Sequence, residues 1–159
     1  MSNDSILARI QRLEDIEAIG RLKTAYCQHC DASFNADAVA ALFTDDGVWD
    51  GGMLRGRKIG RQAIREQFAL TRHRIPFSAH LLSNAQIDVS GDIATGRWRM
   101  LMPFNTVEDG QRGARWQITS YEDDFSRVDG AWLFKCIRVR LSRLDSEGGL
   151  WTELDAHPQ

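Results

Sequence analysis

The sequence predicts an α+β domain in which amino-terminal helices pack on one face of a strongly curved, mainly antiparallel sheet. In roughly the first 72 residues, apolar side chains recur every three or four positions, as on one face of a helix. After that point they fall on alternate positions, as on one face of a strand. Turn sequences at residues 90–92 (Ser-Gly-Asp) and 128–130 (Val-Asp-Gly) separate consecutive strands, which favours an antiparallel meander.

The first predicted helix spans residues 13–31. Its apolar residues share one face at helical spacing: Leu13, Ile16, Ile19, Leu22, Tyr26 and Cys30. Asn35 can cap a short second helix over residues 36–43, and residues 44–47 (Thr-Asp-Asp-Gly) then stop it. A short strand follows at residues 48–52. A third helix spans residues 60–72, with Ile64 and Phe68 one turn apart on its buried side.

Four strands are predicted in the second half, at residues 77–89, 93–104, 113–125 and 132–141. Alternation along the first of them assigns one apolar face: Phe77, Ala79, Leu81, Ala85, Ile87 and Val89. This places His80 on the other face, with Ser78, Asn84 and Gln86. A β-bulge, or a concave face that becomes polar at one end, would return His80 to the interior.

Two strand faces can line a ligand cup. One carries Trp98, Met100, Met102 and Phe104, and the other Trp132, Phe134, Cys136, Arg138 and Arg140. If these faces are concave, they form an aromatic and methionine-rich cup with arginines toward its mouth. The alternative is that these side chains simply form part of the hydrophobic core. Residues 144–159 are expected to form no regular element, because Gly148, Gly149 and Pro158 interrupt them.

Composition bounds the function. The 159 residues fit one domain, predicted over 1–142, with a carboxy-terminal extension at 143–159. A net charge of -2 gives no electrostatic reason to expect nucleic acid or an anionic membrane as partner. No apolar run approaches the roughly 20 residues of a membrane span, and the opening residues lack signal-peptide features. We therefore expect a cytoplasmic protein whose partner is a small hydrophobic molecule or a second copy of the chain.

Cysteine spacing raises the question of a metal or redox site. Cys27 and Cys30 form a Cys-x-x-Cys within a helical pattern, and Cys136 leaves an odd count. No second pair completes a zinc site, and the motif does not follow a strand as a thioredoxin-like site does. Free thiols, no metal and no cofactor are expected; the sequence also carries no Gly-rich phosphate loop and no nucleophile elbow.

Asp31 and His80 are the candidate chemical groups. A carboxylate that orients an imidazole makes a general base, if the fold brings together two segments 49 residues apart. Asp31 could instead only favour the turn that ends its helix. A carboxylate at a helix carboxy terminus is disfavoured by the helix dipole, however, and pairing with His80 would compensate.

The order of several short motifs resembles the SnoaL-like branch of the nuclear transport factor 2-like superfamily. They are residues 13–19 (Leu-Glu-Asp-Ile-Glu-Ala-Ile) followed by Tyr26 and Asp31, residues 94–98, the hairpin at 129–132, and the strand end at Val139 and Arg140. The similarity covers roughly residues 10–142. Within the branch, bile acid 7-alpha-dehydratase, scytalone dehydratase and gamma-hexachlorocyclohexane dehydrochlorinase are similar to this sequence.

The resemblance implies a cone-shaped α+β barrel and a cofactor-free lyase in which an aspartate-held histidine abstracts a proton from carbon. Carried over by position, these residues are Asp31 and His80, with Tyr26 and Arg140 as the further catalytic candidates. The match departs at Met102, where the bile acid enzyme has an acidic residue. It also departs at Trp49 and Asp50, where other members have tyrosines.

The leading hypothesis is therefore a dehydratase-like lyase or an isomerase acting on a hydrophobic cyclic, steroid-type or aromatic-type molecule. Its pocket walls are predicted to be Phe43, Trp49, Trp98, Met100 and Met102. The alternative is a non-catalytic ligand-binding or oligomerising protein, like the small subunit of ring-hydroxylating dioxygenases, because fold does not fix function. The resemblance also implies a homodimer or homotrimer.

Overall fold

A computed structural model describes residues 3–108, 110–145 and 151–153 of the chain. The helices are α1 (Asn3–Asp31), α2 (Ala36–Ala41), α3 (Gly52–Arg55) and α4 (Arg61–Arg74). The strands are β1 (Phe43–Asp50), β2 (Arg57–Ile59), β3 (Phe77–Ser78), β4 (Leu81–Ser90), β5 (Ile93–Glu108), β6 (Gln111–Val128), β7 (Ala131–Asp145) and β8 (Trp151–Glu153). None of the helices in these ranges is long and apolar enough to cross a membrane.

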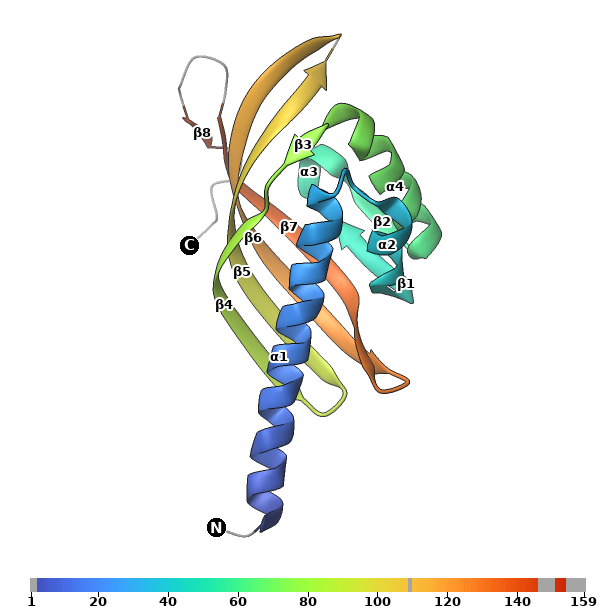
Figure 1. Cartoon of the computed structure of the whole chain (residues 1–159), viewed down its shortest axis with the longest axis vertical. Helices are drawn as coiled ribbons and strands as arrows, with labels where there is room; N and C mark the ends of the chain where they lie inside the picture. Colours follow the sequence, from blue (N-terminus) through green and yellow to red (C-terminus); the bar gives the residue numbers. More distant parts are fainter. Residues whose placement is uncertain (1–2, 109, 146–150, 154–159) are drawn as a thin grey trace.

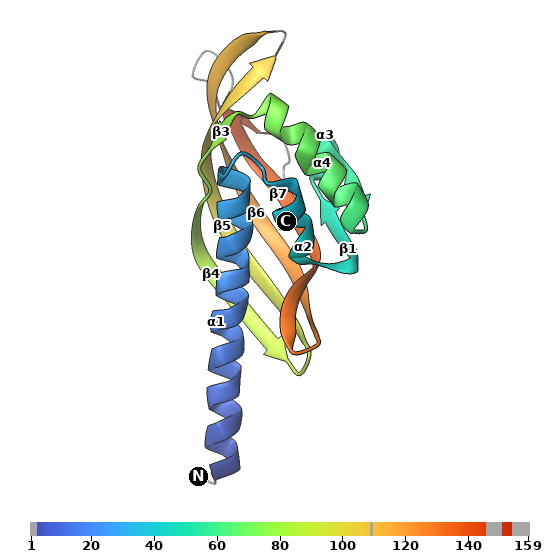
Figure 2. The same ribbon diagram turned by 45° about the vertical axis from the view of Figure 1, so that its right-hand side comes forward.

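One curved sheet contains all of the described strands, and the predicted α+β class is confirmed. Its order is β2-β1-β7-β6-β5-β3, with β4 also paired to β5 and β8 to β7. Every pairing is antiparallel except that of β1 with β7. Across the described strands the sheet curves around α1 without closing into a barrel (Figure 1). Helices α2, α3 and α4 gather beside β1 and β2 (Figure 2).

The carboxy-terminal half of α1 lies in the concave face of the sheet (Figures 1 and 2). Ile19, Tyr26 and Cys30 are almost fully buried there, as their spacing predicts. Burying a side chain of the size of Ile19 stabilises the fold by about 1.5–3 kcal/mol. Leu13, however, is 66% exposed, so its prediction as a core residue is wrong. The helix also begins ten residues earlier than the apolar pattern indicates, at Asn3, in a part that has no buried face.

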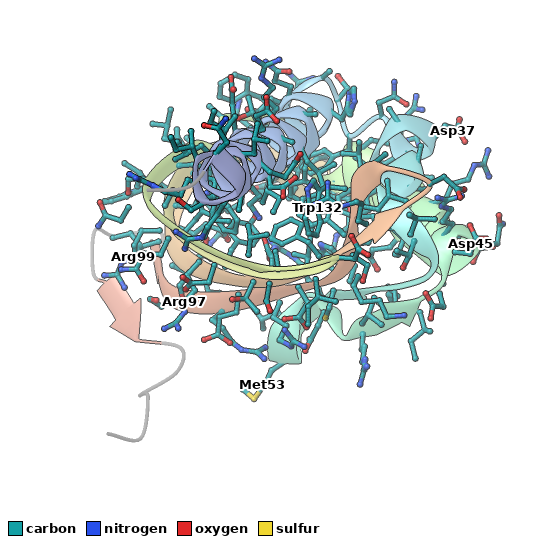
Figure 3. The ribbon with its side chains drawn as sticks, turned by 90° about the horizontal axis from the view of Figure 1, so that it is seen from below. Asp37, Asp45, Met53, Arg97, Arg99 and Trp132 are labelled. Atoms are coloured by element: carbon teal, nitrogen blue, oxygen red, sulfur yellow. The ribbon has the colours of Figure 1, made fainter. Side chains whose placement is uncertain are left out.

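Seen along α1, the two faces of the sheet differ in character (Figure 3). Trp132 lies between α1 and the sheet, whereas Arg97 and Arg99 point away from the opposite face. The inward residues of β5 are buried as the alternation predicts: Trp98, Met100, Met102 and Phe104. These side chains belong to the core, and of the four only Met102 also lines the pocket beside His80.

Other boundaries differ modestly from the sequence predictions. The second helix ends at Ala41, and Phe43 begins β1, so residues 44–47 belong to a strand instead of a helix stop. In α4, Ile64 and Phe68 are buried as predicted. The expectation that residues 144–159 form no regular element is wrong where the structure describes them, because β7 continues to Asp145 and β8 pairs with it.

A β-bulge in β4 decides which side chains of this segment face inward. Ser83 pairs with Arg99 and Gln86 with Arg97, so two residues of β4 stand opposite one of β5. Asn84, within the bulge, has a φ of 54°. The extra residue reverses the alternation, and the apolar face predicted for residues 77–89 is therefore wrong in its first part. Phe77 and Leu81 are 53% and 55% exposed, and the intervening even-numbered side chains face the interior.

Candidate active site

The carboxylate of Asp31 lies where α1 ends against the segment between β3 and β4. The chain leaves the helix through Ser33 and Phe34, with φ values of 59° and 52°. The Asp31 carboxylate makes three polar contacts with the segment between β3 and β4. Ser78 Oγ lies 3.1 Å from Oδ1, the backbone nitrogen of His80 lies 3.0 Å from Oδ2, and His80 Nδ1 lies 2.6 Å from Oδ1.

These contacts determine the charge of Asp31. Burial alone would raise the pKa of its carboxyl. Hydrogen bonds from the side chain and backbone of His80, the attraction of the imidazole and the hydrogen bond from Ser78 outweigh that effect, so the pKa lies below its usual value. Asp31 is therefore ionised at neutral pH. The same hydrogen bonds also offset the unfavourable interaction of this negative charge with the helix dipole at the end of α1.

His80 is held in a defined orientation. Its side chain is only 5% exposed, and its ring meets the ring of Phe34 edge-on at a centroid distance of 6.4 Å. The pairs Ser78–Phe104 and Leu81–Leu101 flank it in one continuous register, which places His80 opposite the inward-facing Met102. Because Nδ1 is engaged by Asp31, Nε2 is the nitrogen left for a bound molecule.

The imidazole forms part of the wall of a pocket of about 390 Å³, measured to its open mouth. The apolar part of the wall consists of Phe34, Phe68, Ile75, Met102 and Val139. The polar part consists of Tyr26, Trp49, Arg55, Thr71, His80, Gln117 and Tyr121. A mostly apolar wall with a few polar groups is typical of small-molecule sites.

Tyr26 and Trp49 meet across this pocket. Trp49 Nε1 donates a hydrogen bond of 3.0 Å to the hydroxyl oxygen of Tyr26, which leaves the hydroxyl's own proton for a second acceptor. Burial raises the pKa of Tyr26 well above its usual value. The phenol is consequently a hydrogen-bond donor and not a base at neutral pH.

The structure does not bring all of the predicted site residues together. Arg140 Nη1 lies 3.5 Å from Asp50 Oδ2, on β7 and the end of β1, and is not part of the pocket wall. Phe43 packs against Phe134 at a centroid distance of 5.4 Å, in the core. Trp98 and Met100 are buried in the core as well and do not line this pocket. Of the five predicted wall residues, Trp49 and Met102 do line it.

Several pocket residues are absent from the sequence prediction. Arg55 comes from a one-turn helix between glycines, where no periodic pattern marks the inward side. Tyr121 and Gln117 lie on the inward face of β6 at even spacing, so alternation in that strand could have identified them. Ser78 does not line the pocket but donates a hydrogen bond to Asp31, and its inward position could have been found only with the bulge known.

The cysteines of the Cys-x-x-Cys are free and buried. Burial raises the pKa of Cys27 to about 12 and also raises that of Cys30. Thiols of this kind are poor nucleophiles and poor metal ligands at neutral pH. Cys30 contributes to the pocket wall as a small apolar group.

Comparison with known proteins adds a family and several similar folds. A family model described as the SnoaL-like domain matches residues 11–138. A search of curated proteins finds no significant match.

Three solved structures illustrate the similarity. A Novosphingobium aromaticivorans protein described as a scytalone dehydratase is 23% identical, with a TM-score of 0.79 over 93% of this chain and 97% of that one. One from the same organism, described as an aromatic ring hydroxylase, is 27% identical, with a TM-score of 0.76 over 84% and 93%. The hexachlorocyclohexane dehydrochlorinase of Novosphingobium barchaimii is 23% identical, with a TM-score of 0.77 over 89% and 96%.

Proposed function

Because this chain belongs to the SnoaL-like domain family, we propose that it is a cofactor-free lyase or isomerase acting on a small hydrophobic cyclic molecule. The observation that carries the proposal is the contact of 2.6 Å between His80 Nδ1 and Asp31 Oδ1 in the wall of an apolar pocket. Structural neighbours described as a dehydratase and a dehydrochlorinase support the same class of reaction.

The proposed chemistry begins with His80 Nε2, which removes an acidic proton from a carbon next to a carbonyl group. The ionised Asp31 stabilises the imidazolium that forms. The electron pair of the broken C–H bond passes through an enolate and then forms a C=C bond as the neighbouring C–O bond breaks. The departing oxygen takes back the proton held on His80 Nε2 and leaves as water, which returns His80 to its neutral form. Dehydration is the first reaction that we would expect.

Tyr26 is suited to the negative charge that develops on the carbonyl oxygen. Its hydroxyl is protonated, buried and oriented by Trp49. A fixed donor of this kind in a dry site stabilises an enolate more strongly than water does. A positioned base contributes roughly 10² to 10⁴ in rate, so alignment in the pocket and this donor must supply the remainder.

A direct test uses 3-hydroxy-1-tetralone, which loses water to give the fluorescent product 1-naphthol. We expect the wild-type protein to accelerate this loss, and His80→Gln and Asp31→Asn each to slow it by about 100-fold or more. His73→Gln is the matched control for the histidine, because His73 is exposed on α4, and Asp88→Asn is the control for the aspartate, with a side chain 80% exposed.

A second readout covers isomerisation. In D₂O, 1-tetralone lacks a leaving group but should exchange its protons next to the carbonyl, which proton NMR follows directly. If neither compound reacts faster with wild-type protein than with His80→Gln, the acid/base proposal fails. The non-catalytic ligand-binding function, which the similarity to a protein described as an aromatic ring hydroxylase also supports, would then be preferred.

A further inference from the structure

Arg55 occupies an unusual position in the pocket wall. It is the last residue of α3, a single turn that begins after Gly51 and ends at Gly56. Gly56 donates a backbone hydrogen bond of 2.8 Å to Gly52, which closes the turn. A side chain at position 51 would not fit, because its Cβ would lie 2.5 Å from Arg55 Cβ and from the ring of Trp49. The turn therefore fixes the start of the Arg55 side chain beside a ring that also lines the pocket.

The guanidinium of Arg55 has no anionic partner within the described ranges. No carboxylate oxygen there lies within 4.0 Å of it, and no hydrogen bond from it is formed to a described residue. Other partly buried arginines on the sheet are paired, as Arg138 with Asp124 at 2.6 Å and Arg127 with Asp15 at 2.8 Å. Withdrawing a cation from water without a partner costs free energy, so a bound anion would be strongly favoured at this position.

The neighbouring polar groups are donors that complement an oxygen anion. Tyr121 is 2% exposed and lines the pocket, and within the described chain its hydroxyl has no hydrogen-bond partner. Burial raises the pKa of Tyr121 well above its usual value, so the hydroxyl keeps its proton. Burial also lowers the pKa of Arg55, but an arginine remains charged at neutral pH. One cation and one protonated phenol thus line the same cavity.

We propose that the ligand of this pocket is a hydrophobic ring that bears an acidic oxygen group, a carboxylate or a phenolate, and that Arg55 and Tyr121 bind this group. The proposal deepens the acid/base function above by naming the substrate class, and it rests on the same pocket. The planar guanidinium can hold a carboxylate through two parallel hydrogen bonds, whereas a phenolate offers one oxygen to both donors. Phe68 and Met102 provide the apolar surface for the ring.

Calorimetric titration with matched probes tests the charge preference. The probes are 2-naphthoate and 2-naphthamide. For the phenolate, 2-naphthol is titrated at one pH above and one pH below its own pKa. We expect wild-type protein to bind 2-naphthoate at least about tenfold more tightly than 2-naphthamide, as for a charge-assisted hydrogen bond. Arg55→Met should abolish this preference, and Arg55→Lys should keep part of it. Arg57→Met is the control, because Arg57 is two residues away and exposed.

The outcomes separate the two proposals. The preference for 2-naphthoate should persist in His80→Gln, because binding of the anion does not require the base. Equal affinity for the two probes in wild-type protein, or no binding of 2-naphthoate at millimolar concentration, would overturn the role of Arg55 while leaving the dehydration assay to decide the acid/base chemistry. If Arg55→Met still binds 2-naphthoate more tightly than 2-naphthamide, the anion-binding role of Arg55 is overturned as well. Stronger binding of ionised 2-naphthol than of 2-naphthoate would identify the phenolate as the group.

Discussion

Lys23 and Asp123 form an ion pair in the centre of the molecule. Lys23 Nζ lies 2.8 Å from Asp123 Oδ2, and the two side chains are 1% and 0% exposed. The ammonium also lies 3.3 Å from the ring centroid of Tyr121 and 5.0 Å from that of Tyr26. Burial raises the pKa of Asp123 to about 6, against the attraction of Lys23. Tyr26 and Tyr121 also line the pocket, so the Lys23–Asp123 ion pair supports two of the pocket residues from the core side.

Removing one charge of this pair should destabilise the protein strongly. We expect Lys23→Met to lower the free energy of unfolding by about 3–5 kcal/mol, since it leaves a buried carboxylate without its partner. Adding Asp123→Leu should restore much of the loss. Urea unfolding followed by tryptophan fluorescence measures both. Arg21→Met, which removes an exposed pair with Glu17, should change stability by less than about 1 kcal/mol. Equal stability of Lys23→Met and wild type would contradict the structural role.

Asp15 provides a pH-dependent contribution to stability. Arg127 donates two hydrogen bonds of 2.8 Å to its carboxylate and Trp132 Nε1 donates one of 3.1 Å. The hydrogen bonds from Arg127 in particular lower the pKa of Asp15 below 3.8. A lowered pKa means that the unfolded chain takes up the proton first as the pH falls. The contribution is therefore complete well above pH 3.8 and is lost as the pH falls through the lowered value.

Asp15→Asn should accordingly cost about 2 kcal/mol at pH 7, as for hydrogen bonds to a charged group, and progressively less below about pH 4. Thermal unfolding of both proteins from pH 7 to pH 2.5 measures the difference. Asp88→Asn serves as the control, because its side chain is 80% exposed and lies 3.9 Å from Arg12. A cost that grows as the pH falls would show that the sign is wrong.

Among the elements, β4 shows where pattern reasoning succeeds and where it fails. Alternation identified the strand and the inward position of Ile87 and Val89. It failed for the residues before Asn84, because the one extra residue of the bulge reverses which of their side chains face inward. Nothing in the local sequence distinguishes a bulge from an unbroken strand. The residues themselves suggested a contact between Asp31 and His80, and the family resemblance strengthened that expectation, but neither could establish the contact without the fold.

The glycine-bounded turn of α3 shows a second limit of prediction from the sequence pattern. Gly51, Gly52 and Gly56 indicate a turn at this point in the sequence. They do not indicate that Arg55 faces the interior, because a single turn has no periodic pattern to compare. Strand β7 shows the opposite case, since Arg140, which was predicted for the pocket, pairs instead with Asp50 at the end of β1. Long elements were predictable, whereas the short irregular segments that complete the site were not.

The bulge can be tested by substitution at Asn84, whose φ is 54°. Asn84→Val should destabilise the protein by about 1–2 kcal/mol, because a side chain branched at Cβ fits the left-handed region poorly. Asn84→Gly should be neutral within about 0.5 kcal/mol, since glycine adopts this conformation without strain. Denaturant unfolding compares the two variants, with Ser83→Val as the neighbouring control. Equal effects of Val at positions 83 and 84 would argue against the bulge.

At the scale of the whole molecule, large apolar side chains remain exposed on the outer face of the sheet. They include Leu81, Ile93 and Leu101. We propose that the protein forms a homodimer or homotrimer, as the family resemblance implies. Light scattering coupled to size-exclusion chromatography should then give two or three times the chain mass of 18.0 kDa over a dilution series. A mass of one chain at micromolar concentration would contradict this proposal.

The amino-terminal part of α1 has a further physical consequence. Up to Glu14 its described side chains are all exposed, and the helix continues beyond the edge of the sheet (Figure 1). An isolated helical segment of about 12 residues is only marginally stable in water. This segment should therefore unwind and reform many times while the core around Ile19 stays folded. The same helix thus combines a fraying end with a rigid end, and Asp31 lies on the rigid one.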